Sequence, residues 1–356
     1  MKPTLTKIRK AIPKPLRQFI KNLFAFRYLG RRPRGYRDYM QSMISDQIHS
    51  PRAWGNPVSI TIEPVNVCNL RCPVCETGAG ILGRRPEMMS YENYVKIMDK
   101  VGPAANTMIF YFMGEPFLNK DAYRMIRYAR NTDIYVDTCT NGEPIDPEAL
   151  YESGINHISF QIGGITQETH EIYRVRGNLG KTLGVLERYL NIIRKKGRKP
   201  SEHQVELGFI LMKHNEHEIG DFYRKAKELG VDQATVISPC VRTVEQGECF
   251  LPTSDEFWLY DREVFEKNHQ LVPKYFFTPN SCPWIYYTMT IQVNGDVVAC
   301  CRDPRGTMIM GNLIEQPLEE VWNGKPFQEL RRMIARDQSR VNLCQLCGGY
   351  GQPALH

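Results

Sequence analysis

The chain has 356 residues, of which 42% are apolar and 24% charged, and its formal net charge is +7 at pH 7. These values are typical of a folded globular protein with one large or two modest domains, and they exclude a largely disordered chain. No apolar run is long enough for a secretory signal or a membrane span, so we expect the eleven cysteines to be in the reducing cytoplasm.

The positive charge is concentrated in residues 1–37, which contain twelve Lys or Arg and no acidic residue. Within them, apolar residues recur at helical spacing over 7–28, interrupted by Pro13 and Pro15. A basic amphipathic helix of this kind can lie on an anionic membrane surface, bind an acidic partner or pack on its own domain. No further basic and aromatic motif follows, so no nucleic-acid partner is expected. We interpret 1–49 as an N-terminal extension that could hold a cytoplasmic protein at the membrane periphery.

Six short apolar segments alternate with helical patterns in the following part of the chain. The predicted strands are 58–63, 107–113, 134–138, 157–162, 205–211 and 233–237. The predicted helices are 91–101 with Ser90 as N-cap, a stretch ending at Arg130, 147–153, 181–195 and 216–229. This alternation predicts an α/β fold of parallel units. Six units are too few for the closed eight-unit form, so residues 50–240 are predicted to form an open, partial (β/α)6 TIM-like barrel.

The loop after the first predicted strand contains Cys68, Cys72 and Cys75 within eight residues. Thiolates at this spacing suit an iron–sulfur cluster, and three of them leave one iron of a [4Fe-4S] cluster open to a small molecule. Structural zinc is the alternative. It would need a fourth ligand, and no histidine lies within fifteen residues of this loop.

The octet Cys-Asn-Leu-Arg-Cys-Pro-Val-Cys from Cys68 to Cys75 resembles the signature of the radical S-adenosylmethionine (SAM) enzymes, with Val74 where that family usually has an aromatic residue. The resemblance implies that the open iron chelates the amino and carboxylate groups of SAM. It further implies that reductive cleavage of SAM produces a 5′-deoxyadenosyl radical, which takes a hydrogen atom from the substrate. A flavodoxin- or ferredoxin-type protein would donate the electron.

Other residues of the same resemblance follow the predicted strands, at the end where parallel barrels bind ligands. Gly114-Glu115-Pro116 is similar to the motif that holds the SAM amino group, and Asn141 follows the third strand. Gln161 stands near the position at which relatives contact the SAM ribose. Arg174 resembles an arginine of the family whose guanidinium suits the SAM carboxylate, with a surface ion pair as the alternative.

The βα pattern ends near residue 240, and 241–274 is predicted to be a linker with a helix. Asn294-Gly295 between the alternating segments 288–293 and 297–300 predicts a β-hairpin, and a helix is predicted over 326–334. Four cysteines in this part supply a complete ligand set for one metal centre, either an iron–sulfur cluster or zinc. They are Cys282, Cys300, Cys344 and Cys347, with Cys301 as an alternative to Cys300.

The spacing Cys282-x12-Gly295-x4-Cys300 resembles the start of the SPASM domain of many radical SAM enzymes. Because only one Cys-x2-Cys pair follows, the chain is more similar to the shortened, twitch form of that domain. The resemblance implies a small C-terminal α+β domain over 275–356 with one auxiliary [4Fe-4S] cluster. Full ligation by cysteine would suit this cluster to electron transfer.

The sequence therefore predicts a radical SAM oxidoreductase that removes a hydrogen atom and then an electron from a small molecule such as a sugar or cyclitol. One alternative is a ribosomal-peptide maturase, although the N-terminal extension is too short and too rich in proline for a leader-binding domain. Another is a radical epimerase in which Cys240 returns a hydrogen atom, where the other explanation for Cys240 is a small buried apolar residue. A non-catalytic electron carrier is disfavoured, because the first cysteine group lacks a fourth ligand.

Overall fold

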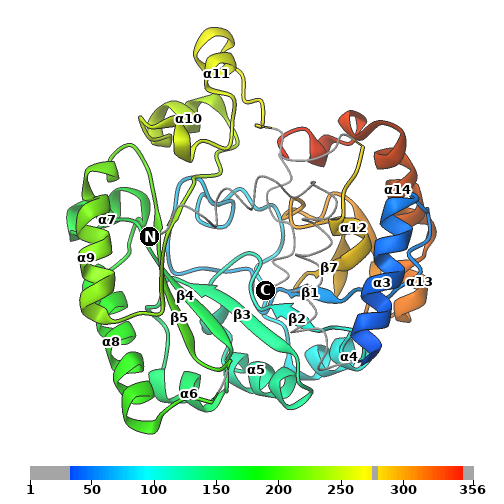
Figure 1. Ribbon diagram of the computed structural model, residues 1–356, viewed down its shortest axis with the longest axis horizontal. Coiled ribbons are helices and arrows are strands. Elements are labelled where there is room, and N and C mark those ends of the chain that lie inside the picture. Colours follow the sequence, from blue (N-terminus) through cyan, green and yellow to red (C-terminus); the bar gives the residue numbers. More distant parts are fainter. Residues whose placement is uncertain (1–32, 200, 275–279, 348–356) are drawn as a thin grey trace, which may run out of the picture.

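A computed structural model describes residues 33–199, 201–274 and 280–347 of the chain. At its centre is a nine-stranded sheet in the order β6-β5-β4-β3-β2-β1-β7-β8-β9 (Figure 1). The segment 7–28, predicted to be an amphipathic helix, lies outside the described residues.

The first six strands are parallel and lie next to one another in chain order, as predicted. They are β1 (Ser59–Ile62), β2 (Thr107–Ile109), β3 (Tyr135–Thr140), β4 (His157–Ile162), β5 (Gln204–Ile210) and β6 (Gln233–Ile237). β6 and β9 are the two edges of the sheet, so the described strands do not close into a ring. The open, six-unit barrel predicted from the sequence is therefore confirmed.

Helices cover the outside of these six strands (Figure 1). They are α4 (Tyr91–Val101), α5 (Ala122–Asn131), α6 (Pro147–Glu152), α7 (Gln167–Tyr173), α8 (Leu179–Lys196) and α9 (Ile219–Leu229), with short 3-10 helices η1 (Pro116–Leu118) and η2 (Glu216–Glu218). The Ser90 side chain accepts a hydrogen bond from the Asn93 backbone N–H and caps α4, as predicted. Fully buried strand residues such as Ile60, Met108 and Val205 belong to the core between strands and helices.

The predicted C-terminal hairpin continues the sheet of the barrel. β7 (Thr288–Ile291) pairs in parallel with β1, and β8 (Asp296–Val298) pairs antiparallel with β7. Gly295 in the connecting turn has a φ of +85°, which favours glycine. β8 ends at Val298, so the predicted strand 297–300 was wrong at its end. A further strand, β9 (Ile309–Asn312), pairs with β8 and was missed because glycine interrupts this short apolar segment.

Helices from both ends of the described chain pack together beside β7 (Figure 1). They are α3 (Pro33–Gln47), α12 (Trp284–Tyr287), α13 (Leu318–Trp322) and α14 (Lys325–Asp337), and α14 confirms the predicted helix over 326–334. The buried Trp322 donates its Nε1–H to the Gly55 carbonyl at 2.8 Å. Arg331 donates to the Pro51 carbonyl at 3.2 Å. These bonds attach the C-terminal helices to the segment that leads into β1.

Two helices lie between β6 and α12, in the segment predicted to be a linker with a helix. They are α10 (Val244–Phe250) and α11 (Arg262–Asn268), and both stand apart from the helices that cover the barrel (Figure 1). The remaining short turns are η3 (Asp255–Phe257), η4 (Gln338–Arg340) and η5 (Asn342–Cys344). Within the described ranges, every helix is too short or too polar to cross a membrane.

Candidate functional site

A cavity of about 890 Å³ runs through the barrel. At one end it is lined by the loops that follow the strands, including the predicted ligands Cys68, Cys72 and Cys75. At the other end it is lined by first residues of strands, such as Ser59, His157 and Gln204. We call these two ends the rim and the floor.

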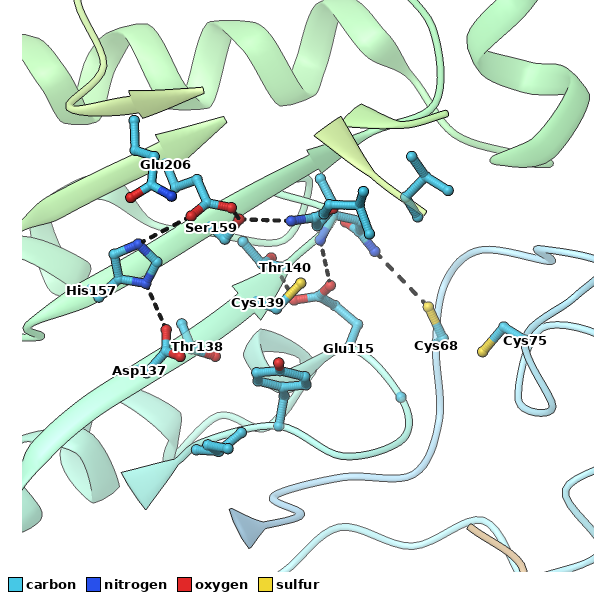
Figure 2. Close-up of a pocket in the computed structure, with 18 of the residues that line it drawn as sticks. Cys68, Cys75, Glu115, Asp137, Thr138, Cys139, Thr140, His157, Ser159 and Glu206 are labelled. Atoms are coloured by element: carbon cyan, nitrogen blue, oxygen red, sulfur yellow. Dashed lines mark hydrogen bonds and ion pairs between the residues drawn. The ribbon is translucent and has the colours of Figure 1, made fainter. Parts of the chain in front are cut away.

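The three cysteines lie in an irregular loop between β1 and α4. Cys68 and Cys75 lie on the same side of the pocket in Figure 2, and the Cys75 N–H donates to the Cys72 carbonyl at 3.2 Å. Arg242 holds this loop from outside, since its Nη1 donates to the Val74 carbonyl at 3.0 Å and its Nη2 lies 2.8 Å from Glu76. Burial raises the pKa of Cys68 to about 12. A metal bound here would therefore have to displace the thiol protons.

Glu115 is a buried carboxylate at the rim, only 3% exposed. Its Oε1 accepts a hydrogen bond from the Thr140 hydroxyl at 2.7 Å, and its Oε2 accepts one from the Asn141 N–H at 2.8 Å. Burial raises the pKa of Glu115 to about 7. Gly114 has a φ of +81°, and a Cβ there would lie 2.6 Å from the carbonyl oxygens of Val65 and Val67. Only glycine therefore lets Glu115 approach the cysteine loop this closely.

Asn141 connects the end of β3 to the cysteine loop. Its Nδ2 donates to the Asn69 side chain at 2.8 Å and lies 3.9 Å from the Cys68 sulfur. Pro116 begins η1, immediately after Glu115. Thr140 and Asn69 were not predicted as site residues. Both are polar residues beside a predicted one, and only the folded loop shows that they contact it.

Arg174 and Gln161 take different positions along the cavity wall. Arg174 follows α7 and lies beside Cys72, and its Nε is buried without a hydrogen-bond partner among the described residues. An unsatisfied guanidinium N–H suits an anionic ligand such as a carboxylate. Gln161 instead donates its Nε2 to the Ser159 hydroxyl at 2.6 Å, which joins it to the wall of the cavity below the rim.

The donor set at the rim is consistent with an iron–sulfur cluster that binds an amino acid. Three thiols can ligate iron, an unpartnered Arg174 N–H can bind a carboxylate, and the buried Glu115 can accept a hydrogen bond from an ammonium group. In the part of the chain that the structure describes, no three His, Cys, Asp or Glu side chains are arranged to hold a single metal ion.

A group of charged residues that the sequence did not reveal lies at the floor. Figure 2 shows His157 between Asp137 and Glu206, on the opposite side of Glu115 from Cys68. The Nδ1 of His157 lies 2.7 Å from Asp137 Oδ1, and its Nε2 lies 3.6 Å from Glu206 Oε2. We call Asp137, His157 and Glu206 the floor group. The only sequence signal was that each of them stands in a predicted strand. Side chains along a strand alternate between the two faces of the sheet, and one of these faces is the interior of the barrel.

The structure brings the second set of cysteines together from distant segments. Burial, together with the nearby Cys344 and Cys347, raises the pKa of Cys282 to about 12. Burial also raises the pKa of Cys300, which has Cys282 and Cys344 as neighbours. Burial also raises the pKa of Cys301 to about 12, where Arg302 opposes the rise and Cys347 and Cys240 add to it. Cys301 was predicted only as an alternative to Cys300, because adjacent side chains on a strand point to opposite faces. Both lie in the turn beyond β8, where side chains need not alternate.

Cys240 lies between the end of β6 and this second set, and it is not among the residues that line the cavity. Its sulfur is 2.9 Å from Arg302 Nη1 and 3.8 Å from the Tyr260 hydroxyl. Arg302 Nη2 also donates to the Leu346 carbonyl at 3.3 Å. Cys240 is thus connected to the segment that carries Cys344 and Cys347.

Comparison with known proteins gives two matching sequence families. The radical SAM superfamily matches residues 62–236, and the SPASM iron-sulfur cluster-binding domain matches residues 282–348. Together these ranges cover most of the chain and contain both cysteine groups.

Several relatives are similar over most of their length. The mycofactocin maturase MftC of Mycobacterium ulcerans is 25% identical over 316 residues, which are 83% of this chain and 81% of that protein. The PqqA peptide cyclase of Gluconobacter oxydans is 21% identical over 292 residues, 78% of this chain and 79% of that protein. The crystal structure of Streptococcus suis SuiB bound to the precursor peptide SuiA shares the fold, with a TM-score of 0.58 at 15% identity, over 88% of this chain and 74% of that chain.

Proposed function

The chain belongs to the radical SAM superfamily and carries a SPASM domain, and from that premise we propose that it oxidatively modifies a peptide. Its cofactors are SAM, a [4Fe-4S] cluster that binds SAM, and auxiliary iron–sulfur clusters. The observation that carries the radical chemistry is the convergence of Cys68, Cys72, Cys75, Glu115 and Arg174 at one end of a single cavity. The choice of a peptide rests on the relatives.

In this proposal each rim residue has one task. When bound, the reduced cluster and SAM supply the 5′-deoxyadenosyl radical that takes a hydrogen atom from the substrate. Cys68, Cys72 and Cys75 ligate the cluster. Glu115 accepts a hydrogen bond from the SAM ammonium, and Arg174 donates its free Nε–H to the SAM carboxylate.

The names of the relatives favour a peptide over the small molecule that the sequence predicted. PqqA peptide cyclase is named for a peptide, and MftC is named a maturase. Both align with most of this chain, so the likeness extends beyond the cysteine motifs. A sugar or cyclitol substrate has less support. The epimerase alternative also has less support, because Cys240 contacts Arg302 instead of lining the cavity.

The second cysteine group fits an oxidation. Loss of a hydrogen atom from a C–H bond leaves a carbon radical, and loss of one electron and one proton from that radical completes a two-electron oxidation. Cys282, Cys300, Cys344 and Cys347 would hold the electron acceptor. Four protein ligands leave that acceptor no open position for substrate, which suits electron transfer.

The radical SAM activity is tested on the anaerobically reconstituted protein with SAM and dithionite, by chromatography of 5′-deoxyadenosine. The wild type should form it, and Cys72→Ala should lose it completely, because one cluster ligand is missing. Cys249→Ala is the matched control, since Cys249 is exposed and belongs to neither group. Absence of 5′-deoxyadenosine from the iron-loaded wild type would contradict the assignment.

The substrate class is tested separately. Each short peptide encoded beside the gene is co-expressed with the enzyme and examined by mass spectrometry. We expect one of them to lose two hydrogens with the wild type and to remain unchanged with Cys72→Ala. If 5′-deoxyadenosine forms while every such peptide stays unmodified, a peptide substrate is wrong and the radical chemistry stands.

A further inference from the structure

The floor group lies far below the rim. His157 and Gln161 are the first and fifth residues of β4, and both line the cavity. At about 3.3 Å per residue, the four steps between them correspond to about 13 Å along the strand. A molecule that reaches from the rim to the floor must therefore extend through the barrel.

The floor group carries one excess negative charge. Burial alone would lower the pKa of His157, but its contacts with Asp137 and Glu206 outweigh burial and raise the pKa to about 9. Burial would raise the pKa of Glu206, but His157 and Ser159 lower it. At neutral pH an imidazolium thus lies between two carboxylates.

Neighbouring titratable groups do not neutralise this excess. Burial raises the pKa of Cys139 to about 12 and raises the pKa of Tyr111 well above its usual value. Both side chains line the same cavity and remain neutral at pH 7. The charged residues nearer the rim, Glu115 and Arg174, are opposite in sign and are assigned to SAM.

Part of the floor group faces the cavity with free acceptor capacity. The Oδ1 of Asp137 is hydrogen-bonded to His157, while its Oδ2 has no hydrogen-bond donor among the residues that the structure describes. The Asp137 side chain is 36% exposed. In contrast, Glu206 Oε1 accepts from the Ser159 hydroxyl at 2.9 Å. Charges inside proteins are normally paired, and a single uncompensated carboxylate in a confined cavity attracts a cation.

We propose that the carboxylates of Asp137 and Glu206, on either side of His157, bind the ammonium or guanidinium group of a basic side chain of the substrate. This inference rests on the proposed peptide substrate and specifies one of its residues, a lysine or an arginine. The basic side chain enters the barrel, its charged end reaches Asp137 at the floor, and its carbon chain extends back toward the rim. Asp137 and Glu206 are then positioning residues, and they take no part in hydrogen abstraction.

The test measures the binding of small probes to the reconstituted, SAM-bound protein by isothermal titration calorimetry. Butylammonium and butylguanidinium carry the proposed cations, while butyramide and butyrate have similar size with neutral and negative ends. We expect the two cations to bind at least about tenfold more tightly than butyramide, since a charged hydrogen bond is stronger than a neutral one. Equal binding of butyramide or butyrate would overturn the proposal.

Substitutions separate a binding role from a structural one. Asp137→Asn and Glu206→Gln keep the side-chain size and should each weaken cation binding about tenfold while leaving butyramide binding unchanged. His157→Gln removes the competing positive charge, so it should retain or strengthen cation binding. If the floor group only stabilises the fold, His157→Gln would weaken binding as much as Asp137→Asn. Glu319→Gln is the control, because Glu319 is exposed and does not line the cavity.

Failure of this inference is distinguishable from failure of the proposed function. Once a modified peptide is found, each of its lysines and arginines is replaced by norleucine. If the peptide is modified equally well without any of them, the floor does not select a basic residue and peptide oxidation stands. If the cations bind as expected and no peptide is modified, the floor assignment stands and the peptide substrate is wrong.

Discussion

The two cysteine groups are assembled in different ways. Cys68, Cys72 and Cys75 lie within eight residues of one loop, so the short chain between them already keeps them near one another. Cys282, Cys300, Cys344 and Cys347 come from segments up to sixty-five residues apart, and they meet only because β7 joins β1 and α14 packs beside it. The first group therefore depends on its loop, and the second depends on the fold.

This difference matches the proposed division of chemistry. In that proposal a local group of three would leave a coordination position for SAM, while a dispersed group of four would enclose its metal centre. The contact of Arg302 with Cys240 and the Leu346 carbonyl places the second group next to the barrel edge at β6. Damage to one group should consequently leave the chemistry of the other measurable.

The largest effect is expected from Cys344→Ala. Removing one ligand of the second group should abolish peptide oxidation, because the substrate radical loses its electron acceptor. Formation of 5′-deoxyadenosine should continue at a rate within a few-fold of wild type. Iron content should fall from about eight to about four per chain, since each cubane contains four irons. Chromatography, mass spectrometry and iron analysis measure the three quantities.

The variant to compare with Cys344→Ala is Cys72→Ala, which should lose both the formation of 5′-deoxyadenosine and the oxidation of the peptide. Cys249→Ala should retain both. If Cys344→Ala abolished 5′-deoxyadenosine while the first group kept its iron, the two groups would not be chemically separable. If the second group of the wild-type protein contained zinc instead of iron, the proposed electron acceptor would be absent.

A buried ion pair connects the two regions, and breaking it should be strongly destabilising. Glu63 lies just after β1, and its oxygens accept from Arg84 at 2.6 and 2.7 Å and from the Val293 N–H at 2.9 Å. Glu63→Gln leaves a mostly buried guanidinium without its counter-charge, so the free energy of unfolding should fall by about 3 to 5 kcal/mol. Denaturant titration of the metal-loaded protein measures the change.

The control for this prediction is Arg52→Met, which breaks the exposed pair between Arg52 and Glu319. Exposed pairs contribute less than about 1 kcal/mol, so this variant should resemble wild type. If the free energy of unfolding fell by a similar amount in both variants, burial would not make the Glu63–Arg84 pair more stabilising than the exposed pair.

Glu115→Gln tests the first region without removing a ligand. Loss of the carboxylate that accepts from the SAM ammonium should raise the Kd of SAM by about tenfold to a hundredfold, within the range for a charged hydrogen bond. The pKa of Glu115 is raised to about 7, so the carboxylate form is lost as the pH falls below that value. In the wild type, the Kd of SAM should rise up to about tenfold for each pH unit below about 7.

Equilibrium dialysis of SAM at several pH values compares the two proteins. The Gln variant should lack this pH dependence, because its side chain does not titrate. A Kd with the same pH slope in both proteins would assign the titration to another group. Iron content serves as the check that the cluster survives the substitution.

Much of the barrel could be predicted because its signals are local. The strands 157–162 and 233–237 have the predicted bounds, since alternating or apolar segments bounded by turns identify them. The rim residues were also predictable, because parallel strands present their following loops at one edge. The pairing of β7 with β1 has no local signal, as it joins segments more than two hundred residues apart. The floor group was missed for the same reason, since its members meet only across neighbouring strands.

The smallest predicted effect tests how far the second group depends on remote packing. Trp322 donates its Nε1–H to the Gly55 carbonyl, which attaches α13 to the segment before β1. Trp322→Phe keeps an aromatic ring but loses this bond and some volume, so the free energy of unfolding should fall by about 1 to 3 kcal/mol. We expect iron to be lost first from the second group on dilution into chelator, because its four ligands rely on this packing. The first group should keep its iron and its 5′-deoxyadenosine activity, since its cysteines are held by the loop and by Arg242. Equal loss of iron from both groups would mean that the local loop also needs the C-terminal helices, and the contrast between the two groups would disappear.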